Sequence, residues 1–391
     1  MKKYLAIILG MLLVLAMVAV ASAETKFTMS GDARVRGTWQ NDYDFNNDAD
    51  ADKRWWEHRI RLAIDAVADG GSSLHTRLSL TDWNQTWTGS GEAGGLTEPN
   101  SRLLDYAYIN VPLGNGVTAT LGKVIVGWGK GFWAWDRRAY RLLLGKQFGD
   151  TKVVVFTQKS LETNVTGDKN LDDNDAYSIL AIHKTKNLTV GGIYVYANAK
   201  ALNPIADGHA FNVYFDGKAG AINYFGEFVY TTGDANEQVN AAGNKKKPYG
   251  GFVHLDYTMG NVTLVGAVAL AQNGFTSDND FNPTFFYGTA QSTAALNFGG
   301  NGDTFAILGA VVYKVSNDLS LMGKLAYANV DKFSSSQVDV NLTELDLGLT
   351  YKINKSTTYN IDFGYLKPDI KVAGAKEDPA MALAHRIVVN F

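Results

Sequence analysis

Polar and apolar residues alternate along most of this chain with a period of two. From 27 to 39, odd positions are apolar or small and even positions are polar, over a run of thirteen residues. The alternation recurs around 59–65, 211–216, 344–351 and 359–365. A period of two predicts β-strands, and this run is longer than a typical soluble strand.

The connections between the predicted strands fall into two classes. Eight short turn signals lie at 69–71, 114–116, 149–150, 186–187, 217–218, 260–261, 317–318 and 354–355. Nine longer polar stretches lie around 40–53, 84–101, 128–138, 161–174, 200–208, 232–249, 273–303, 331–340 and 367–378. Seventeen connections predict 18 strands, within a range of 16 to 18. Short turns on one side and long loops on the other are typical of a transmembrane barrel.

The predicted fold is therefore all-β, a transmembrane antiparallel up-and-down β-barrel. Its apolar residues would face lipid, and its polar residues would face a wet lumen. A barrel of this size is too wide for side chains to fill, so it leaves an aqueous channel. The longest loop, 273–303, contains the aromatic residues Phe275, Phe281, Phe285, Phe286 and Tyr287, which favour a packed loop.

The first 23 residues have the pattern of a cleaved export signal. Lys2 and Lys3 precede an apolar run from 4 to 20, and the small residues Ala21, Ser22 and Ala23 follow. This pattern predicts a signal peptide at 1–23 and a mature domain at 24–391. A permanent membrane helix is the alternative, because the apolar run approaches the length needed to span a bilayer.

Composition excludes several classes of function. The chain has no cysteine, so it has neither disulfides nor a cysteine-based zinc or haem site. Without the leader, 34 Lys and Arg residues face 39 Asp and Glu residues, which argues against nucleic-acid binding. The six histidines lack metal-ligand spacing, and no hydrolase or phosphate-loop motif is present. The sequence thus predicts no enzyme activity, no metal and no cofactor.

The last strand ends on an aromatic residue, with the apolar residues Ile387, Val389 and Phe391 on one face. Such an ending resembles the assembly signal of Gram-negative outer-membrane proteins. Residues 30–37 resemble the first strand of porin-like families, and 121–123 lead into a Gly-Trp-Gly-Lys-Gly segment before the third long stretch. The mature chain resembles Gram-negative porins in organisation. This resemblance implies an outer-membrane location among lipid and lipopolysaccharide, insertion by the barrel assembly machinery, and a homotrimer.

Charged residues predicted to face the lumen separate into two walls. The basic wall comes from the first three strands and the last strand: Arg34, Arg36, Arg59, Arg61, Arg77 and Arg386. The acidic wall comes from later strands: Asp216, Glu227, Asp256, Glu344, Asp346 and Asp362. Asp32 and Asp65 are exceptions that we expect to pair with nearby arginines. Facing walls of opposite charge would create a transverse field across the pore, although ordinary solvated lumen residues give the same pattern.

The third long stretch is a candidate constriction loop. Its charged residues are Lys130, Asp136, Arg137, Arg138 and Arg141, so four cations stand against one acid. In the porin family this loop folds into the lumen and narrows it, which would favour anions here. The alternative is an ordinary external loop.

Two further patterns leave alternatives open. All eight tryptophans precede residue 136, and they fit half of an interfacial aromatic girdle or a stacking surface at the mouth. The aspartates of 42–52 and 168–175 are typical of solvated external loops, and a Ca²⁺ site with oxygen ligands is the alternative.

The predicted function is a porin that passes small hydrophilic solutes and ions by diffusion. The alternatives are a solute-specific channel for a sugar or an organic anion, and an outer-membrane barrel enzyme.

Overall fold

The computed structural model describes most of the chain from residue 25 onward. The described residues are 25–42, 53–81, 85–86, 104–161, 174–199, 206–233, 238–239, 245–278, 280–281, 283–284, 286, 298–300, 302–333, 338–372 and 374–391. The predicted signal peptide at 1–23 lies outside them. No helix among these residues is long and apolar enough to cross a membrane.

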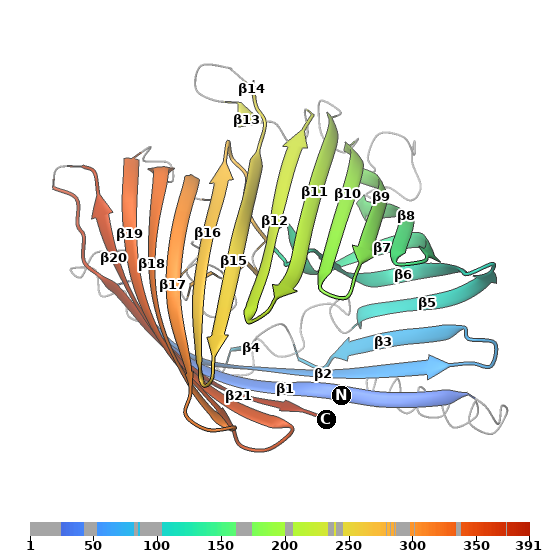
Figure 1. Ribbon diagram of the computed structural model, residues 1–391, viewed down its shortest axis with the longest axis horizontal. Helices are drawn as coiled ribbons and strands as arrows, with labels where there is room; N and C mark the ends of the chain where they lie inside the picture. The colour runs from blue at the N-terminus through green and yellow to red at the C-terminus, as the bar shows by residue number, and fades with distance from the viewer. Residues whose placement is uncertain are drawn as a thin grey trace.

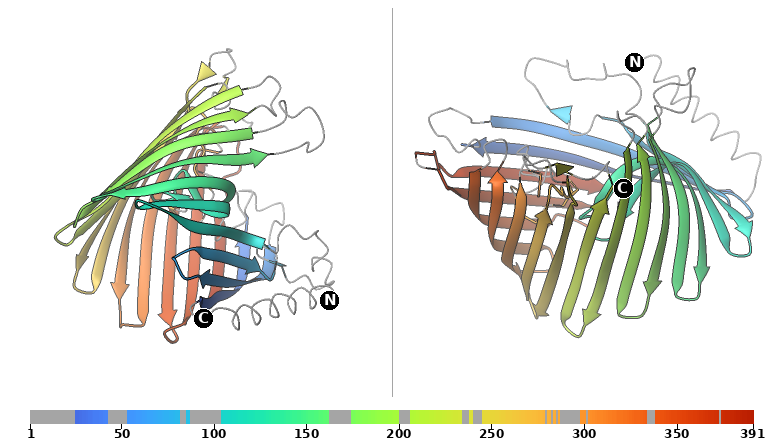
Figure 2. Two further views of the ribbon diagram at one scale, coloured as in Figure 1. Left: turned by 90° about the vertical axis from the view of Figure 1, so that its right-hand side faces the viewer. Right: turned by 90° about the horizontal axis from the view of Figure 1, so that it is seen from above.

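Eighteen strands of the described chain pair edge to edge and close on themselves (Figures 1 and 2). They are β1 (Lys26–Asn41), β2 (Lys53–Val67), β3 (Ser73–Ser79), β5 (Leu104–Gly114), β6 (Val117–Trp128), β7 (Ala134–Phe148), β8 (Thr151–Leu161), β9 (Asn174–Lys184), β10 (Leu188–Ala199), β11 (Ala206–Ala219), β12 (Ile222–Thr232), β15 (Tyr249–Met259), β16 (Val262–Gln272), β17 (Asp303–Lys314), β18 (Leu319–Phe333), β19 (Val338–Lys352), β20 (Thr357–Ile370) and β21 (Ala380–Asn390). Each pairs antiparallel with its neighbours along the chain, and β21 pairs with β1. The preferred count of 18 is thus confirmed.

Three short strands stand apart from this ring. β4 (Gln85–Thr86) pairs with the loop end of β2, where β3 has already ended. β13 (Gln238–Val239) and β14 (Lys245–Lys246) form a small separate sheet within the connection from β12 to β15.

The connections follow the predicted alternation of short turns and long loops. Seven of the eight predicted turns lie where strands meet, but the turn predicted at 217–218 is wrong in position. β11 continues through Ala219, and the chain reverses at Gly220, whose φ of +61° suits glycine. The third loop is also shorter than predicted, because β6 reaches Trp128 and β7 begins at Ala134.

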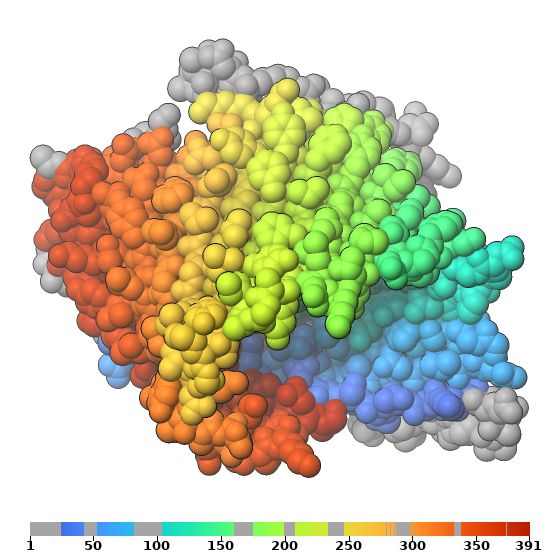
Figure 3. All heavy atoms as spheres, in the orientation of Figure 1, coloured from blue at the N-terminus to red at the C-terminus, as the bar shows by residue number. Residues whose placement is uncertain are grey.

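The outer surface of the barrel is apolar, as the alternation predicts. Exposed side chains include Leu255, Ile307, Leu325 and Leu347, each at least 49% exposed. In Figure 3 the side chains of β10 to β19 form a continuous outer surface, and a hollow opens between the turn ends of β10 to β12 and β1. Exposed apolar residues on every second position of a closed sheet suit a lipid environment.

The barrel closes through the first and last strands. The Gly31 amide donates to the Phe391 carbonyl at 2.7 Å, and the Phe391 amide donates back to the Gly31 carbonyl at 3.0 Å. Ile387 and Val389 pair with Val35 and Ala33 in this seam. The Phe391 ring lies so close to Gly31 that an added Cβ would meet it at 2.5 Å. Recognition of these C-terminal residues by an assembly machine stays a prediction.

Substitution Gly31→Val should impair closure of the barrel. Its Cβ would also lie 2.7 Å from the Arg61 carbonyl oxygen, so the backbone itself must shift, at a cost of about 1 to 3 kcal/mol. We expect a lower yield of heat-modifiable barrel when the urea-denatured protein refolds into vesicles. Ala33→Val, two residues along the same strand face, is the matched control. Equal yields for both variants would show that the seam tolerates the added bulk.

The interior differs from the prediction in one respect. The inward faces of β7 to β10 are largely apolar, with Phe156, Leu180 and Ile193 in one cluster. The prediction that inward positions are polar is therefore wrong for this sector. A second apolar cluster, described below, forms where loops pack against the inner wall.

Candidate pore and its constriction

The tip of the β6–β7 hairpin leaves the barrel wall and bends into the lumen. β7 pairs with β8 only from Tyr140 onward, whereas its first residues, 134–139, pair with β6 alone. At the tip, the Trp128 indole Nε1 donates to the Asn212 side-chain oxygen on β11 at 2.7 Å. Since β11 lies several strands away around the barrel, the hairpin tip crosses part of the lumen.

A single buried carboxylate receives the tip of this hairpin. Glu227 of β12 is 2% exposed. Its Oε2 accepts the backbone N–H groups of Lys130 at 2.8 Å and Phe132 at 3.3 Å. Its Oε1 accepts the Trp133 N–H at 3.1 Å and the Asn212 amide at 2.8 Å. The carboxylate satisfies donors that the loop would otherwise bury without partners.

Glycine is required where the tip approaches this carboxylate. Gly129 has a φ of +59°, and a Cβ there would lie 2.5 Å from Glu227 Oε2. Gly131 has a φ of +81°. These two residues let the chain reverse within five residues and place its N–H groups on Glu227.

The connection from β16 to β17 also packs inside the barrel. Its described aromatics Phe275, Phe281, Phe286 and Phe298 form a cluster with Phe132 from the hairpin tip and with the inner wall. The predicted packing of this loop is thus confirmed for its described residues. Phe285 and Tyr287 lie outside them.

Polar contacts join the two inward segments and anchor the longer one. The Asp278 N–H donates to the Phe132 carbonyl at 2.8 Å, and the Arg137 guanidinium contacts the Asp278 carboxylate at 2.5 Å. On β19, Glu344 accepts from the Thr284 hydroxyl at 2.6 Å and from the Phe286 N–H at 2.9 Å. The two segments therefore form one barrier inside the barrel.

Asp280 lies on this barrier in an acidic setting. Burial raises the pKa of its carboxyl group, and the neighbouring Asp278 and Asp136 carboxylates raise it further. The nearby guanidinium groups of Arg138 and Arg137 act in the opposite direction.

The predicted basic wall occupies one continuous part of the interior. β21, β1, β2 and β3 are adjacent, and they bring together Arg34, Arg36, Arg59, Arg61, Arg77 and Arg386. Arg36 lies directly opposite both Arg386 and Glu57 in the strand register. Acidic side chains lie among the guanidinium groups of this wall. The sequence predicted only some of them.

Acidic partners are interleaved with these arginines. Asp32 binds Arg59 at 3.1 Å and Arg61 at 2.7 Å, as expected. Among the described residues Asp65 pairs with His75, at 2.7 Å, and with no arginine, so the pairing expected for it is wrong there. Sequence reasoning missed two acids that take part. Glu57 pairs with Arg36 at 2.6 Å and Arg34 at 3.4 Å, and Asp105 pairs with Arg77 and Arg138.

A sequence signal existed for only one of the missed acids. Glu57 alternates with the inward arginines 59 and 61, so the period of two places it on the same face. Asp105 lies at an irregular register between β3 and β5, where counting by two from neighbouring residues fails.

The predicted acidic wall extends from β11 to β20, where it adjoins Arg386 of the basic wall on β21, and most of its members are engaged. Asp216 pairs with Lys130, Asp256 with His254 at 2.6 Å, and Asp346 with Lys324 at 3.4 Å. Glu227 and Glu344 hold loop groups as described above. Asp362, on β20, has Arg386 and Lys324 among its charged neighbours. A transverse field between the two walls stays a prediction.

The candidate constriction residues divide between a loop and a strand. Only Lys130 lies on the loop; Asp136, Arg137, Arg138 and Arg141 are part of β7, so placing them on the loop was wrong. Strand pairing explains the difference, since β7 remains bonded to β6 beyond the point where it leaves β8. Their part in narrowing the pore stays a prediction.

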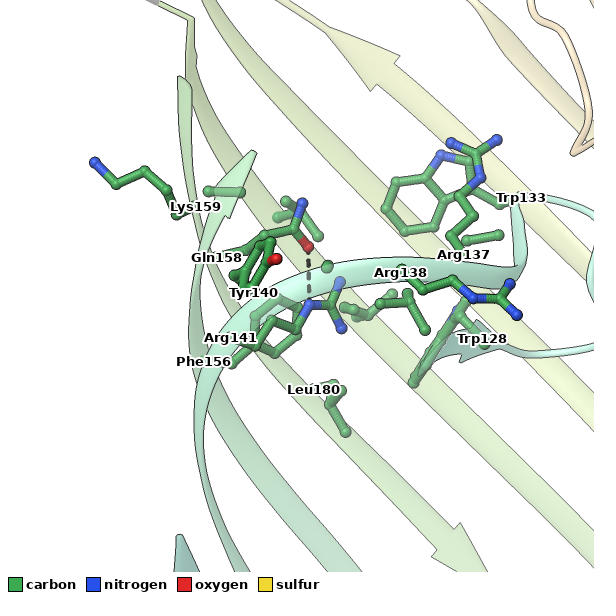
Figure 4. Close-up of a pocket in the computed structure, with 17 residues that line it drawn as sticks. Trp128, Trp133, Arg137, Arg138, Tyr140, Arg141, Phe156, Gln158, Lys159 and Leu180 are labelled. Carbon is green, nitrogen blue, oxygen red and sulfur yellow. Dashed lines mark hydrogen bonds between the residues drawn. The ribbon is translucent and has the colours of Figure 1, made fainter. Parts of the chain in front are cut away.

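Tryptophan side chains lie in two different environments. Trp56 and Trp135 are 43% and 49% exposed, which fits an interfacial girdle. Trp128 and Trp133 instead line an interior cavity of about 470 Å³ behind the hairpin (Figure 4). Trp83 and Trp87 lie outside the described residues.

No group of three potential metal ligands occurs among the described residues. Of the two acidic stretches considered for Ca²⁺, only Asp42 and Asp175 are described, so that alternative stays a prediction.

Comparison with solved structures finds porins. The chain is similar to Pseudomonas aeruginosa OccK9 (OpdG), with a TM-score of 0.61 and 11% identity over 94% of this chain and 99% of that one. It is similar to a BenF-like porin from Pseudomonas fluorescens Pf-5, with a TM-score of 0.58 and 12% identity over 94% and 99%. A structure of Pseudomonas aeruginosa OpdK with vanillate gives a TM-score of 0.56 and 8% identity over 93% and 99%.

The chain has the fold of a Gram-negative porin. No protein-family model and no curated protein sequence matches it. At this level of identity, the similarity describes the barrel and its 18 strands, and the interior residues must be interpreted from their own chemistry.

Proposed function

We propose that this protein is an outer-membrane porin that conducts small hydrophilic solutes and ions. The observation that carries the proposal is a closed barrel of eighteen described strands with an apolar outside, charged inner walls and an inward hairpin. An apolar outside suits lipid, and charged side chains inside suit a hydrated path. Lipopolysaccharide contact, insertion by the barrel assembly machinery and a homotrimer belong to this proposal as predictions.

Selection of organic anions is the second part of the proposal. Among the described residues, the basic wall and Arg138 bring seven guanidinium groups to one side of the lumen, and the four carboxylates of Asp32, Glu57, Asp105 and Asp136 pair with six of them. The excess of positive charge on one side of the lumen favours anions there. OpdK, one of the similar structures, was solved with vanillate, an aromatic carboxylate. This charge excess favours an organic anion over a sugar as the selected solute.

The purified mature protein tests the proposal in a planar bilayer under a salt gradient. We expect ohmic single-channel steps and a reversal potential that indicates a preference for anions. A folded, heat-modifiable barrel that gives no steps would rule out the open pore. A preference for cations would contradict the proposed anion selectivity, but the proposal that the protein is a porin would stand.

A further inference from the structure

A cavity lies behind the β6–β7 hairpin, against the wall strands β8 to β10. It exists because the first residues of β7 leave β8, so the hairpin and the wall strands β8 to β10 enclose a space of about 470 Å³. The hairpin supplies Trp128 and Trp133, and the wall supplies Phe156, Leu180, Ile193 and Val195. These six side chains give the cavity an aromatic and aliphatic surface (Figure 4).

Cationic side chains also line this apolar cavity. Arg137, Arg138, Arg141 and Lys159 line it, and none of its 17 lining residues carries a carboxylate. Arg137, Arg138 and Lys159 each have an acidic partner outside the lining. Among the described residues, no carboxylate lies within ion-pair distance of Arg141.

Arg141 is held in place without being neutralised. Its Nε donates to the Gln158 side-chain oxygen at 2.8 Å, and its guanidinium carbon lies 4.0 Å from the centre of the Phe156 ring. Figure 4 shows the side chain between these two residues. A partly buried cation gains from an anionic partner, and a guanidinium group donates to a carboxylate through two parallel hydrogen bonds.

We propose that this cavity binds an amphipathic anion, a carboxylate on an alkyl body. The carboxylate would bind Arg141, and the alkyl body would lie against Leu180, Ile193 and Val195. The volume is in the range that buries most of a small ligand's surface. Such a site goes beyond conduction, because a bound amphiphile would contact Trp128 and Trp133 of the inward hairpin.

Octanoate is a suitable probe, because it combines one carboxylate with a short alkyl chain. Equilibrium dialysis of radiolabelled octanoate against the full-length mature protein in lipid nanodiscs would measure binding, with empty nanodiscs as the baseline. We expect one saturable site per chain. Arg141→Gln should weaken binding by about tenfold, the effect of losing a hydrogen bond to a charged group. Octanol should show no saturable binding.

Two more variants make the test independent of Arg141. Ile193→Glu places a negative charge where the alkyl body would lie and should abolish saturable binding. Lys152→Gln removes a cation from β8 that is not part of the lining, and should leave binding unchanged. Heat-modifiable migration of each variant shows that its barrel is folded.

Equal affinity in wild type and Arg141→Gln would overturn the proposal, as would the absence of saturable binding above empty nanodiscs. If octanol bound as tightly as octanoate, the proposed recognition of a carboxylate would be overturned. Single-channel recordings on the same preparations separate this inference from the proposed function. Channels that conduct but do not bind octanoate would contradict the cavity alone, and a barrel that binds octanoate but does not conduct would contradict the pore alone.

Discussion

Replacement Glu227→Gln should widen the pore. Two donors converge on each carboxylate oxygen: Lys130 and Phe132 N–H on Oε2, and Trp133 N–H with the Asn212 amide on Oε1. Whichever oxygen becomes an amide nitrogen, two buried donors lose their acceptor. At about 1 to 3 kcal/mol for each unsatisfied donor, the inward position of the hairpin tip loses about 2 to 6 kcal/mol. A loss in that range changes a two-state ratio by more than tenfold.

Single-channel recording checks this result. We expect larger steps, with switching between conductance levels as the hairpin tip moves. Asp256→Asn is the matched control, because it removes the same charge from the acidic wall while its carboxylate contacts His254. An equal rise in both variants would assign the effect to charge. Unchanged steps in Glu227→Gln would mean that the contacts of Phe132 with the longer loop are sufficient to hold the tip.

Much of the fold could be predicted because a barrel in a membrane must pair every backbone group internally. That requirement imposes a uniform alternation on each strand, which is visible from 27 to 39, and reverses the chain at short turns such as 114–116. The strand count therefore follows from local signals alone. The turn predicted at 217–218 failed because Gly217 lies inside a strand and Gly220 makes the reversal.

The interior was less predictable because its contacts join distant residues. Trp128 and Asn212 are 84 positions apart, and Lys130 and Glu227 are 97 apart. No local pattern shows that a buried glutamate holds loop N–H groups instead of facing water. A signal for the apolar sector did exist: 153–156 is a continuous apolar run, which indicates a strand with both faces apolar.

For the charged walls too, the local pattern could be predicted from the sequence, but the contacts between strands could not. Sequence alternation placed the arginines of β1 to β3 on one face, and adjacent strands then brought them together. The alternation could not show which arginines form ion pairs, because ion pairing depends on the strand register and on how far each side chain extends toward the neighbouring strand. Glu57 and Asp105 reduce the net charge of the basic wall without removing its excess.

Double substitution Arg34→Gln and Arg386→Gln should lower the preference of the pore for anions. Arg36 binds Glu57 at 2.6 Å, whereas Arg34 is 3.4 Å from the same carboxylate, so Arg34 is the weaker partner of that acid. For Arg386, no carboxylate lies within ion-pair distance in the described part of the chain. Each of these two guanidinium groups carries one positive charge of the basic wall, and glutamine keeps much of their packing while removing that charge.

The reversal potential under a salt gradient measures the outcome. Charged clefts hold potentials of several kT, so loss of two cations should lower the anion-to-cation permeability ratio by a factor on the order of several-fold. Higher salt should shrink the difference, because the Debye length falls. Lys146→Gln with Lys367→Gln removes the same charge from strand positions outside the basic wall, one half-buried and one exposed, and should leave the ratio unchanged. An equal change in both double variants would show that selectivity follows the net charge of the protein, because the basic wall would then have no special influence.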